Sequence, residues 1–584
     1  MSRVILGINS VYHESAACLL VDGTMVAFVE EERFNRIRHG KRSFIDNSDD
    51  LPWASIDFCL QHAGLNYADV DGIGYSFDPD LRLKAHLDMP DKPAEGWGSE
   101  DGERNFHAHN MTAKAKLLER MPKAEFFFLG HHLCHAASAY LVSPFDQAAV
   151  LVIDGIGEVG STWLGLGEGE KMTKLETVDY PHSMGFVWEF FSQFLGFDAY
   201  SGPGKVMGYA AITDPEGELT GKDHLAAMRQ ILRPEPDGTF FVDAKAFRFR
   251  TQDFSGLEKH FGPRRLNPVD RYEDASVAAA LQEVTNDIMV HLCDRLYERI
   301  NANRAQPVTD LCLAGGVALN CVANYQVAAR SKFRRIWVQP AANDAGTAVG
   351  AAALVDQQLG GHGRPKMEHA YWGPGYSNEQ VLAAIEAEGL SHSSPNSMPA
   401  EVARRIEQGQ IVAWFQGRQE VGPRALGHRS IVCDPSRFDS RTRLNTRVKY
   451  RESYRPFAPS CLQAAVDRFF EWPADMMAAR FMLFALPLKE KLFKQILPAV
   501  MQENASTGLA TSRIHLVDEE HSPEYAALIH EFDKLTGLPI VLNTSFNIRE
   551  PIVTSPKEAI RTFLNSSMDA LALGPYLVPH PKAD

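Results

Sequence analysis

The chain has 584 residues, of which 45% are apolar and 23% are charged, and its formal net charge is −15 at pH 7. This length predicts roughly two to four domains, and this composition is typical of a globular protein. The acidic balance argues against a general nucleic-acid binder, which needs a basic surface, although local arginines can still attract a small anion.

The apolar runs and the cysteines indicate where such a protein works. No apolar run approaches the roughly 20 residues of a membrane span, so we expect no membrane association. The chain begins directly with a strand-like run at 3–8, so no signal peptide is expected. None of the eight cysteines belongs to a C-x-x-C pair, and most lie in apolar runs. Buried thiols of this kind are typical of a reducing compartment, which predicts a cytoplasmic protein.

The N-terminal region alternates apolar runs with short polar turns. Strands are predicted at 3–8, 16–21 and 24–34, with a turn around His13 and a second turn at 22–23. Strand, turn and strand in this succession predict an antiparallel meander. In sugar kinases, actin and chaperone ATPases, such a first turn holds phosphate. The alternative is a plain hairpin turn with a solvated His13.

Residues 78–123 are rich in Asp, Lys, Pro and His and show little apolar periodicity. They follow a predicted helix at 55–64 and a predicted strand at 73–77. We therefore expect an irregular insertion, and long irregular segments are often binding loops or lids.

Two histidines and an aspartate stand out in the next segment. His131 and His135 lie four residues apart at the start of a helical pattern, after a predicted strand at 126–129. Such positions share one helix face and lie roughly 5–6 Å apart. A further strand at 148–153 ends at Asp154. Two imidazoles and one carboxylate resemble the set that binds Fe(II) and similar ions. The alternative is an ordinary pair of helix histidines with a strand-end aspartate.

Strand, turn and strand recur at 148–167, as in a duplicated fold, and glycine-rich segments follow. The turn at 155–162 and a loop at 201–208, which contains Lys205, could bring amides and an ammonium group to a phosphate, or could simply be solvated.

A long helix is expected at 275–300. The strand at 310–313 runs into glycines at 315 and 316. The strand at 335–338 leads to Asp344, at the start of an alanine-rich helix. An aspartate in that place is also a good helix N-cap.

The C-terminal part contains a cationic cluster inside an acidic protein. Residues 355–397 lack strong periodicity and contain the expected domain boundary. The stretch 417–431 then carries three arginines, one histidine and several glycines, and further basic and polar residues follow at 449–455, 513 and 542–547. Planar guanidinium groups suit phosphate and carbonyl oxygens. Each arginine alone is typical of a surface charge, but the arginines together predict an anion-binding site.

In this order the motifs resemble those of the NodU/CmcH-type O-carbamoyltransferases, the family that carbamoylates Nod factors, cephalosporins and aminoglycosides. The resemblance covers nearly the whole chain. It rests on the His13 turn and on EEERF (30–34), HHLCHAASA (131–139), GKVMG (204–208), GGVALN (315–320), QPAANDAGTA (339–348), EVGPRALGHRSI (420–431) and LNTSFN (542–547).

The resemblance implies an α/β fold with an N-terminal actin-like ATPase domain, a duplicated ribonuclease H-like fold, at 1–365. A linker at 366–397 and a C-terminal YrdC-like α/β domain at 398–584 follow. The C-terminal domain would form carbamoyladenylate from carbamoyl phosphate and Mg-ATP. The N-terminal domain would transfer the carbamoyl group to a hydroxyl of a small metabolite in natural-product biosynthesis. Segment 78–123 does not obviously follow the family pattern and is a candidate acceptor-binding region.

The same resemblance assigns roles to residues. His13 matches the histidine that takes the proton of the acceptor hydroxyl. A divalent metal, expected to be Fe(II), is held by His131, His135, Asp154 and Asp344. The carbamoyl phosphate and carbamoyladenylate site is formed by Arg424, Lys449, Arg455, Arg513, Asn543 and Ser545. The nucleotide pocket of the N-terminal domain is lined by Lys205, Gly315, Gly316 and Asn320. His132 and Cys134 fall off the His131 and His135 face and are expected to be packing residues.

The sequence leaves three alternative functions to compare with this one. A tRNA threonylcarbamoyl-transferase-like enzyme would share the fold, but the acidic balance and the lack of a basic stripe count against it. A non-enzymatic ATP-binding regulator would leave the arginine cluster unexplained. A hydrogenase-maturation carbamoyltransferase would need C-x-x-C pairs, which are absent. The expected partners are carbamoyl phosphate, ATP and a small hydroxylated acceptor, without nucleic acid or membrane. The sequence is compatible with a homodimer and does not identify the acceptor.

Overall fold

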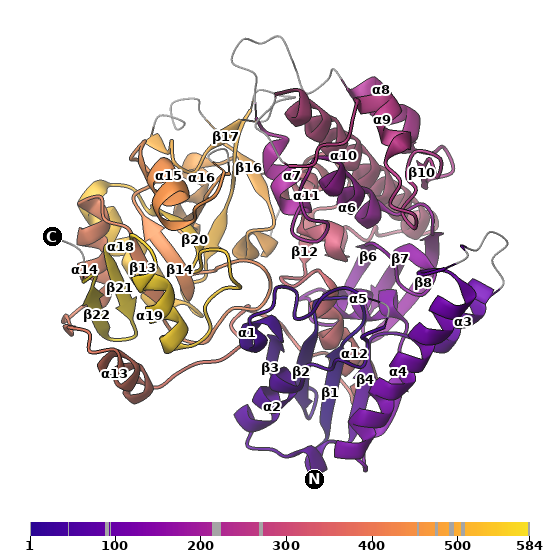
Figure 1. Cartoon of the computed structure of the whole chain (residues 1–584), viewed down its shortest axis with the longest axis horizontal. Helices are drawn as coiled ribbons and strands as arrows, with labels where there is room; N and C mark the ends of the chain where they lie inside the picture. The colour runs from indigo at the N-terminus through magenta and orange to yellow at the C-terminus, as the bar shows by residue number, and fades with distance from the viewer. Residues whose placement is uncertain are drawn as a thin grey trace. The chain divides into compact units, whose positions relative to one another are not determined.

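The computed structural model describes residues 2–44, 46–87, 93, 95–212, 224–267, 272–452, 455–472, 477–489, 496–503 and 509–581. The chain passes from one compact unit to a second between Glu368 and His369, and both units are mixed α/β structures, as expected (Figure 1). The segment 366–397, expected to be a linker, contains helix α13 (Asn378–Ala387), which packs on helix α19 (Pro556–Leu564) of the second unit.

The first sheet of unit 1 has the strand order β3-β2-β1-β4-β5. Strands β1 to β3 are antiparallel neighbours, which confirms the meander expected at the N-terminus, and β4 and β5 are added in parallel to β1. The five strands are β1 (Val4–Asn9), β2 (Ala16–Val21), β3 (Thr24–Glu30), β4 (Gly72–Tyr75) and β5 (Glu125–Phe128).

The second sheet repeats the first. Its order is β12-β11-β6-β7-β8, again an antiparallel meander of three strands with two parallel strands added to its first strand. The strands are β6 (Gln147–Ile153), β7 (Gly160–Glu168), β8 (Lys171–Asp179), β11 (Asp310–Ala314) and β12 (Arg335–Val338). The duplication expected from the repeated sequence pattern is therefore present.

Two helices pack together between these sheets (Figure 1). Helix α12 (Thr347–Gln358) lies on β1, β2 and β4, and helix α5 (His131–Tyr140) lies on β6 and β11. The helices touch at Gly350, where an added Cβ would lie 1.9 Å from the carbonyl oxygen of Cys134. On the other side of α12, a Cβ at Gly7 of β1 would lie 1.9 Å from the carbonyl oxygen of Ala348. Only glycine permits such close backbone approach at both contacts.

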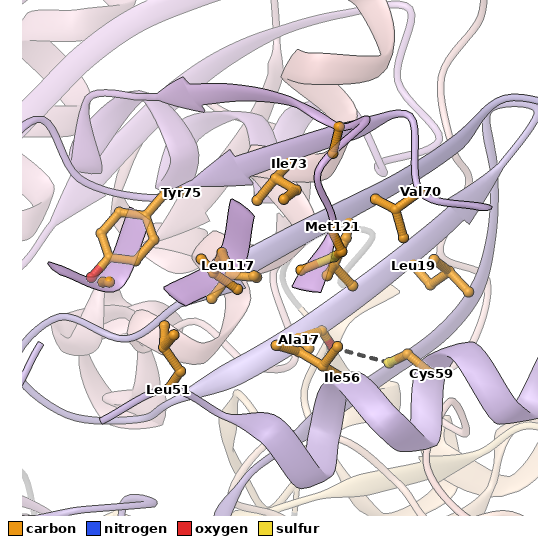
Figure 2. Close-up of a cluster of buried hydrophobic side chains, with 14 of the residues drawn as sticks. Ala17, Leu19, Leu51, Ile56, Cys59, Val70, Ile73, Tyr75, Leu117 and Met121 are labelled. Atoms are coloured by element: carbon orange, nitrogen blue, oxygen red, sulfur yellow. Dashed lines mark hydrogen bonds between the residues drawn. The ribbon is translucent and has the colours of Figure 1, made fainter. Parts of the chain in front are cut away.

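The opposite face of the first sheet is covered by helices α2 (Trp53–His62) and α4 (Glu100–Arg120). Figure 2 shows this core, in which Ile56 and Cys59 of α2 and Leu117 of α4 meet side chains of the strands. The thiol of Cys59 donates to the carbonyl oxygen of Ala17 at 3.6 Å. The cluster is apolar throughout, so this face of the sheet is a packed core.

The expectation that residues 78–123 are irregular was wrong, whereas their being an insertion stays a prediction. Helices α3 (Pro79–Leu87) and α4 occupy most of this segment, while residues 88–92 and 94 lie outside the described part. Helix α4 buries Phe106, Ala113 and Leu117, which lie seven and four residues apart on one face. Mostly polar residues lie between them, so too few large apolar residues mark the helical period for it to be recognised from the sequence.

The remaining elements of unit 1 frame the second sheet. Helix α10 (Tyr272–Asn301), expected at 275–300, packs on β6 and β7. The expected glycine loop at 201–208 is instead largely helix α7 (Pro203–Tyr209), which begins with a proline, as helices often do. The others are α1 (Glu32–Asn35), α6 (Met184–Phe194), α8 (Leu225–Ile231), β9 (Leu232–Pro234), β10 (Phe240–Val242), α9 (Ser255–Phe261) and α11 (Cys321–Arg330), with 3₁₀ turns at Tyr67–Asp69, Gly316–Leu319 and Asp344–Gly346.

Unit 2 is built on a sheet of order β19-β15-β20-β14-β13-β21-β22. Helices α14 (Met398–Glu407) and α18 (Pro523–Thr536) form a core with one face of this sheet. The strands are β13 (Val412–Phe415), β14 (Arg429–Cys433), β15 (Ala458–Leu462), β19 (His515–Val517), β20 (Ile540–Ser545), β21 (Ala570–Leu573) and β22 (Tyr576–Pro579).

A small sheet of order β16-β18-β17 completes unit 2. Its strands are β16 (Ala485–Pro487), β17 (Gln502–Glu503) and β18 (Ala510–Arg513). The remaining elements are α15 (Ser440–Arg443), a π-helical turn at Leu444–Val448, α16 (Val466–Phe469) and 3₁₀ turns at Gln463–Ala465 and Met477–Phe481.

Across the described ranges of both units, none of the helices combines the length and apolar character needed to cross a membrane. All eight cysteines are buried and none is in a disulfide.

We expect Gly350→Ala to destabilise unit 1 by roughly 3 kcal/mol or more, because its Cβ would overlap backbone atoms of α5 that cannot move away. Differential scanning calorimetry and chemical denaturation would measure the loss. The control is Gln358→Ala on the exposed end of the same helix, which should change the free energy of unfolding by no more than about 0.5 kcal/mol. Equal stability of the two variants would contradict the α5–α12 contact.

Candidate functional site

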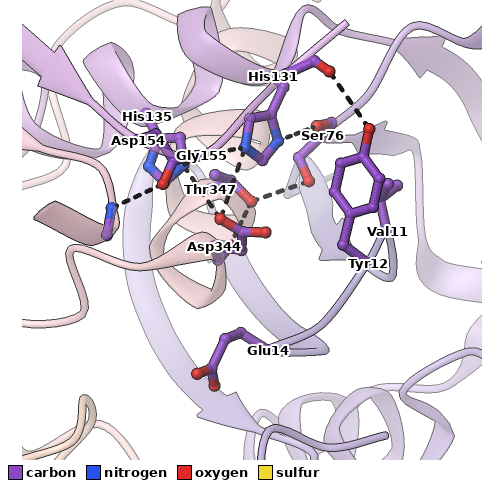
Figure 3. Close-up of polar contacts among 12 residues, drawn as sticks. Val11, Tyr12, Glu14, Ser76, His131, His135, Asp154, Gly155, Asp344 and Thr347 are labelled. Atoms are coloured by element: carbon purple, nitrogen blue, oxygen red, sulfur yellow. Dashed lines mark hydrogen bonds and ion pairs between the residues drawn. The ribbon is translucent and has the colours of Figure 1, made fainter. Parts of the chain in front are cut away.

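Four side chains predicted to bind metal converge at the ends of α5, β6 and α12 (Figure 3). His131 and His135 lie on α5, Asp154 follows β6, and Asp344 opens the turn that leads into α12. All four are buried. The two segments that contribute the aspartates are 190 residues apart in sequence, and the packing of α5 on both β6 and α12 brings them to the same imidazoles. We call these residues the quartet.

The distances within the quartet fit a metal ion. His131 Nε2 lies 3.4 Å from Asp154 Oδ2 and 3.6 Å from Asp344 Oδ1, and the corresponding distances of His135 Nε2 are 3.5 and 3.4 Å. All four ligand atoms lie within 4.8 Å of one another. A point equally far from them would lie roughly 2.0–2.4 Å from each, which is the range of divalent metal bonds to nitrogen and oxygen.

Hydrogen bonds orient the quartet from behind. His131 Nδ1 donates to the carbonyl oxygen of Ser76 at 3.2 Å, which leaves its Nε2 directed at the carboxylates, and Gly316 N donates to Asp154 Oδ1 at 2.9 Å. Both ring nitrogens of His135 are buried and make no hydrogen bond with any described residue. A buried imidazole that faces two carboxylates and makes no hydrogen bond suits a metal ligand.

The two buried carboxylates of the quartet require positive charge beside them. Burial lowers the pKa of His131, but Asp344 and Asp154 outweigh it and raise the pKa well above its ordinary value. The pKa of His135 is raised in the same way. Burial alone would raise the pKa of Asp154, yet the two imidazoles hold it well below the usual range. The carboxylates therefore stay ionised and demand positive charge, from protons or from a metal ion.

The predicted base His13 lies beside the quartet. His13 Nδ1 is 4.0 Å from Asp344 Oδ2, whereas the other oxygen of Asp344 faces His131 and His135. Asp344 thus connects the candidate base with the candidate metal site. Its alternative role as helix N-cap is not observed, because Gly346 occupies that position of α12.

Several residues that build this site could not be recognised in the sequence. Ser76 is fully buried at the end of β4; besides its contact with His131, its hydroxyl accepts from Thr347 Oγ1 at 2.9 Å and donates to Asn9 Oδ1 at 3.0 Å. Asn9 Nδ2 in turn donates to the carbonyl oxygens of His13 and Glu14. Ser76 therefore ties the metal ligands to the His13 turn, and nothing in its sequence context indicated this.

Three acidic residues around the quartet were also missed. Glu158 Oε1 accepts from the backbone N–H of His131 at 2.9 Å, at the start of α5, and burial raises its pKa. Glu14 contacts His39 Nδ1 at 2.6 Å; burial lowers the pKa of His39, but Glu14 raises it to about 9. Burial, followed by Asp154 and Asp344, raises the pKa of Glu189 to about 8. For Glu158 and Glu189, the sequence held one indication: each is a single charged residue in a segment of otherwise small or apolar residues.

The four residues expected to line a nucleotide pocket in unit 1 make separate contacts with different parts of the unit. Gly315 has φ +88°, and an added Cβ would lie 2.3 Å from the carbonyl oxygen of Ile153, so glycine is required there. Gly316 contacts Asp154, as described above. The side chain of Asn320 caps α11 and exchanges hydrogen bonds with Gln282. Lys205 lies on α7, with Nζ 6.0 Å from the ring of Phe197.

Unit 2 brings two of its predicted site residues into contact. Lys449 is 2% exposed, and its Nζ donates to the Ser545 carbonyl oxygen at 2.5 Å, to Ser545 Oγ at 3.4 Å and to Asn547 Oδ1 at 2.8 Å. Asn543, on the same strand β20, donates to the carbonyl oxygen of Ala425, the neighbour of Arg424. Of the two other arginines, Arg455 shortly precedes β15 and Arg513 ends β18.

A cavity of about 410 Å³ lies in unit 2, next to the 420–431 motif. Its walls include His369, Trp372, Arg418, His428 and Tyr525, and none of the six residues predicted to bind carbamoyl phosphate. His369 and Trp372 are stacked with ring centroids 4.5 Å apart. The predicted anion-binding residues and this cavity are therefore separate features of the unit.

Comparison with known proteins identifies relatives along the whole chain. Residues 4–353 match the family described as carbamoyltransferase N-terminus, and residues 403–580 match the family described as carbamoyltransferase C-terminus. The uncharacterized protein sll1178 of Synechocystis is 35% identical over 625 residues, which cover 97% of this chain and 95% of that protein. The nodulation protein NolNO of Sinorhizobium fredii is 33% identical over 600 residues, which cover 98% and 79% of the two chains.

Solved structures show only a distant likeness. The crystal structure of T. kodakarensis HypF has a TM-score of 0.32 and 14% identity, and covers 61% of this chain and 48% of that chain. A TM-score of this size does not establish a shared fold. The sequence matches do establish the family, since the N-terminal match alone spans more than half of the residues. The chain therefore belongs to the carbamoyltransferase family and is an enzyme that transfers a carbamoyl group.

Proposed function

We propose that this enzyme is an ATP-dependent O-carbamoyltransferase whose acceptor is a hydroxyl of a small metabolite. In unit 2, water first hydrolyses carbamoyl phosphate to carbamate and phosphate, and a carbamate oxygen then attacks the α-phosphate of ATP, which forms carbamoyladenylate and releases pyrophosphate. Unit 1 then joins the carbamoyl carbon to the acceptor oxygen and releases AMP, while the hydroxyl proton leaves to a base. The observation that carries the proposal is the position of His13 beside Asp344, which links a general base to a candidate cation site.

His13 acts as the base in this scheme. A hydroxyl is a poor nucleophile at neutral pH, and a positioned histidine contributes typically about 10²- to 10⁴-fold to the rate. Asp344 Oδ2 lies 4.0 Å from His13 Nδ1, which places the proposed base next to the quartet. The rings of His39 and Tyr200 flank the His13 ring, with centroids 6.2 and 5.3 Å from it.

The quartet holds a divalent cation, for which Fe(II) is the proposed occupant because two imidazoles and carboxylates suit this class of ion. When bound, the cation supplies Lewis-acid stabilisation of the negative charge on phosphate and carbonyl oxygens. Gly315, which packs on Ile153, and Gly316, whose N–H donates to Asp154, form the proposed nucleotide pocket together with Lys205 and Asn320.

The adenylate-forming step is proposed for the basic residues of unit 2. Lys449 is a buried ammonium at the end of β20, and Arg424, Arg455, Arg513, Asn543 and Ser545 complete the set. Such groups suit the negative charge of carbamoyl phosphate and of the triphosphate. The repeated strand order of unit 1 supports its proposed actin-like, ribonuclease H-like class. A YrdC-like class for unit 2 is proposed with the adenylate chemistry.

The first test is the partial reaction. We expect the protein, given Mg-ATP and carbamoyl phosphate, to release pyrophosphate in a carbamoyl phosphate-dependent manner, because adenylate formation consumes both. Enzyme-coupled pyrophosphate detection would measure it, and a mass-spectrometric screen of hydroxylated metabolites would then find the acceptor by its gain of one carbamoyl group. Pyrophosphate release at the same rate with and without carbamoyl phosphate would refute the proposal.

Removal of one imidazole should release the metal. We expect His135→Ala to weaken Fe(II) affinity at least about 100-fold, since loss of outer-shell partners alone costs 10–100-fold. Anaerobic titration against a chelator would measure the affinity. His132→Ala is the matched control, because His132 lies on the same helix turn and is not part of the quartet. If both variants bind Fe(II) like the parent, the quartet is not a metal site.

Substitutions in the two units should separate the two steps. We expect His13→Ala to form pyrophosphate at the parental rate but to carbamoylate the acceptor at least about 100-fold more slowly, because it lacks the base. Arg513→Ala should instead lose pyrophosphate release. Both products are measured in one reaction by mass spectrometry. If His13→Ala carbamoylates the acceptor as fast as the parent, His13 is not the base. If Arg513→Ala releases pyrophosphate at the parental rate, Arg513 is not part of the anion site.

A further inference from the structure

The turn that carries His13 is held in an unusual backbone conformation. Its two neighbours, Tyr12 and Glu14, have φ values of +55° and +56°. Non-glycine residues rarely adopt positive φ, and they do so only where the surrounding structure determines the conformation. The position of His13 therefore depends on what holds the residues on either side of it.

One side of the turn is held from within the N-terminal segment. The backbone N–H of Glu14 donates to the carbonyl oxygen of His39 at 2.7 Å, and the Glu14 carboxylate contacts the His39 ring. Asn9 Nδ2 donates to the carbonyl oxygens of His13 and Glu14 at 2.9 and 3.0 Å. These contacts leave the Tyr12 side to be held by another part of the protein.

That part is the α3–α4 segment. Arg82 of α3 is 1% exposed and binds Glu103 of α4 through two parallel bonds, Nε to Oε2 at 2.7 Å and Nη2 to Oε1 at 2.8 Å. Its remaining nitrogen, Nη1, donates to the hydroxyl of Tyr12 at 2.6 Å and to the carbonyl oxygen of Gly157 at 3.3 Å. The Tyr12 ring stacks on Phe106 of α4 with centroids 5.5 Å apart. The turn is thus clamped by both helices.

The same guanidinium reaches the metal-binding half of the site. Gly157 packs on the first turn of α5, where an added Cβ would lie 3.2 Å from His131 Cβ. The next residue, Glu158, accepts from the backbone N–H of His131 and from that of Asp78, just before α3, both at 2.9 Å. Arg82 and Glu158 together connect α3 with the His13 turn and with the helix that presents His131.

We propose that Arg82 is a positioning residue for carbamoyl transfer, which acts through Tyr12 to hold His13 against the quartet. This role rests on the proposed function of His13 and gives the 78–123 segment a task other than acceptor binding. A buried ion pair by itself is weak evidence for stability. The pairing of Arg82 with Glu103 orients the guanidinium, because the two-point contact fixes its plane and directs Nη1 at Tyr12.

The test measures the environment of His13 without any acceptor. Diethyl pyrocarbonate modifies unprotonated imidazoles, and peptide mass spectrometry gives the rate at each histidine as a function of pH. We expect Tyr12→Phe and Arg82→Ala to change the rate and its pH profile at His13, and the rate at the exposed His392 of unit 2 to stay parental. Arg82→Lys should restore little, because an ammonium cannot bind Glu103 and Tyr12 together in this geometry.

A matched control separates position from stability. Arg104→Ala removes an exposed arginine that pairs with Glu100 on α4, and it should leave His13 reactivity unchanged. Tyr12→Phe loses one hydroxyl only, so its folding is checked by its melting temperature, and all rates are measured well below it. Parental reactivity of His13 in a folded Tyr12→Phe and in Arg82→Lys would overturn the proposal.

The transfer assay gives the second readout. With the acceptor found for the parent, Tyr12→Phe should lower kcat by roughly 10- to 100-fold, as expected for a misplacement of about 1 Å, with KM unchanged. Carbamoyl phosphate-dependent pyrophosphate release should stay at the parental rate in Tyr12→Phe and in Arg82→Ala, since this step is proposed for unit 2. Absence of that release in the parent would refute the proposed function alone, whereas an altered KM with parental kcat would refute the role of Arg82.

Discussion

The contact between α5 and α12 is the constraint on which the rest of unit 1 depends. At Gly350 the two helices approach so closely that a single Cβ would overlap the carbonyl oxygen of Cys134. Cys134 is the neighbour of His135, and Gly350 lies six residues after Asp344, so this contact sets the separation between the imidazoles and that carboxylate. Each sheet adds its own strand end to this centre, β4 through Ser76 and β6 through Asp154. The duplicated fold thus produces one site rather than two.

Electrostatics explains why such a site can exist in an acidic protein. Two buried carboxylates would repel each other, and burial of an unpaired charge is expensive. The imidazoles of His131 and His135 lie within 3.6 Å of both carboxylates and offset this cost. Around them, the buried network of Arg82, Glu103, Tyr12 and Glu158 satisfies its polar groups internally. Unit 2 solves the opposite problem, since the buried Lys449 is surrounded by carbonyl and amide oxygens.

Parts of the fold that rest on short-range patterns were predictable. The meander at the N-terminus, the helix of His131 and His135 and the long helix α10 follow from runs of apolar residues whose period is clear. The segment 78–123 was misjudged because α4 buries only a few apolar residues, at wide helical spacing, and is otherwise polar. The segment 201–208 was misjudged because its glycines indicated a loop, whereas the proline at the first helical position starts α7. Local propensity is a weak guide where tertiary packing decides.

By itself, the sequence determined the family and the mixed α/β class with its internal repeat. It also singled out His131, His135 and Asp154 as candidate ligands by their spacing, and Asp344 and His13 as candidates through the family resemblance. It did not reveal that Asp344 contacts His13 as well as the imidazoles, nor that Ser76, Glu158 and Arg82 support them. Those contacts join residues far apart in the chain, such as Arg82 with Tyr12 and Ser76 with Thr347. Only the packing of helices and sheets decides them, since a hydrogen bond depends on distances in space, and no periodicity in the sequence records those.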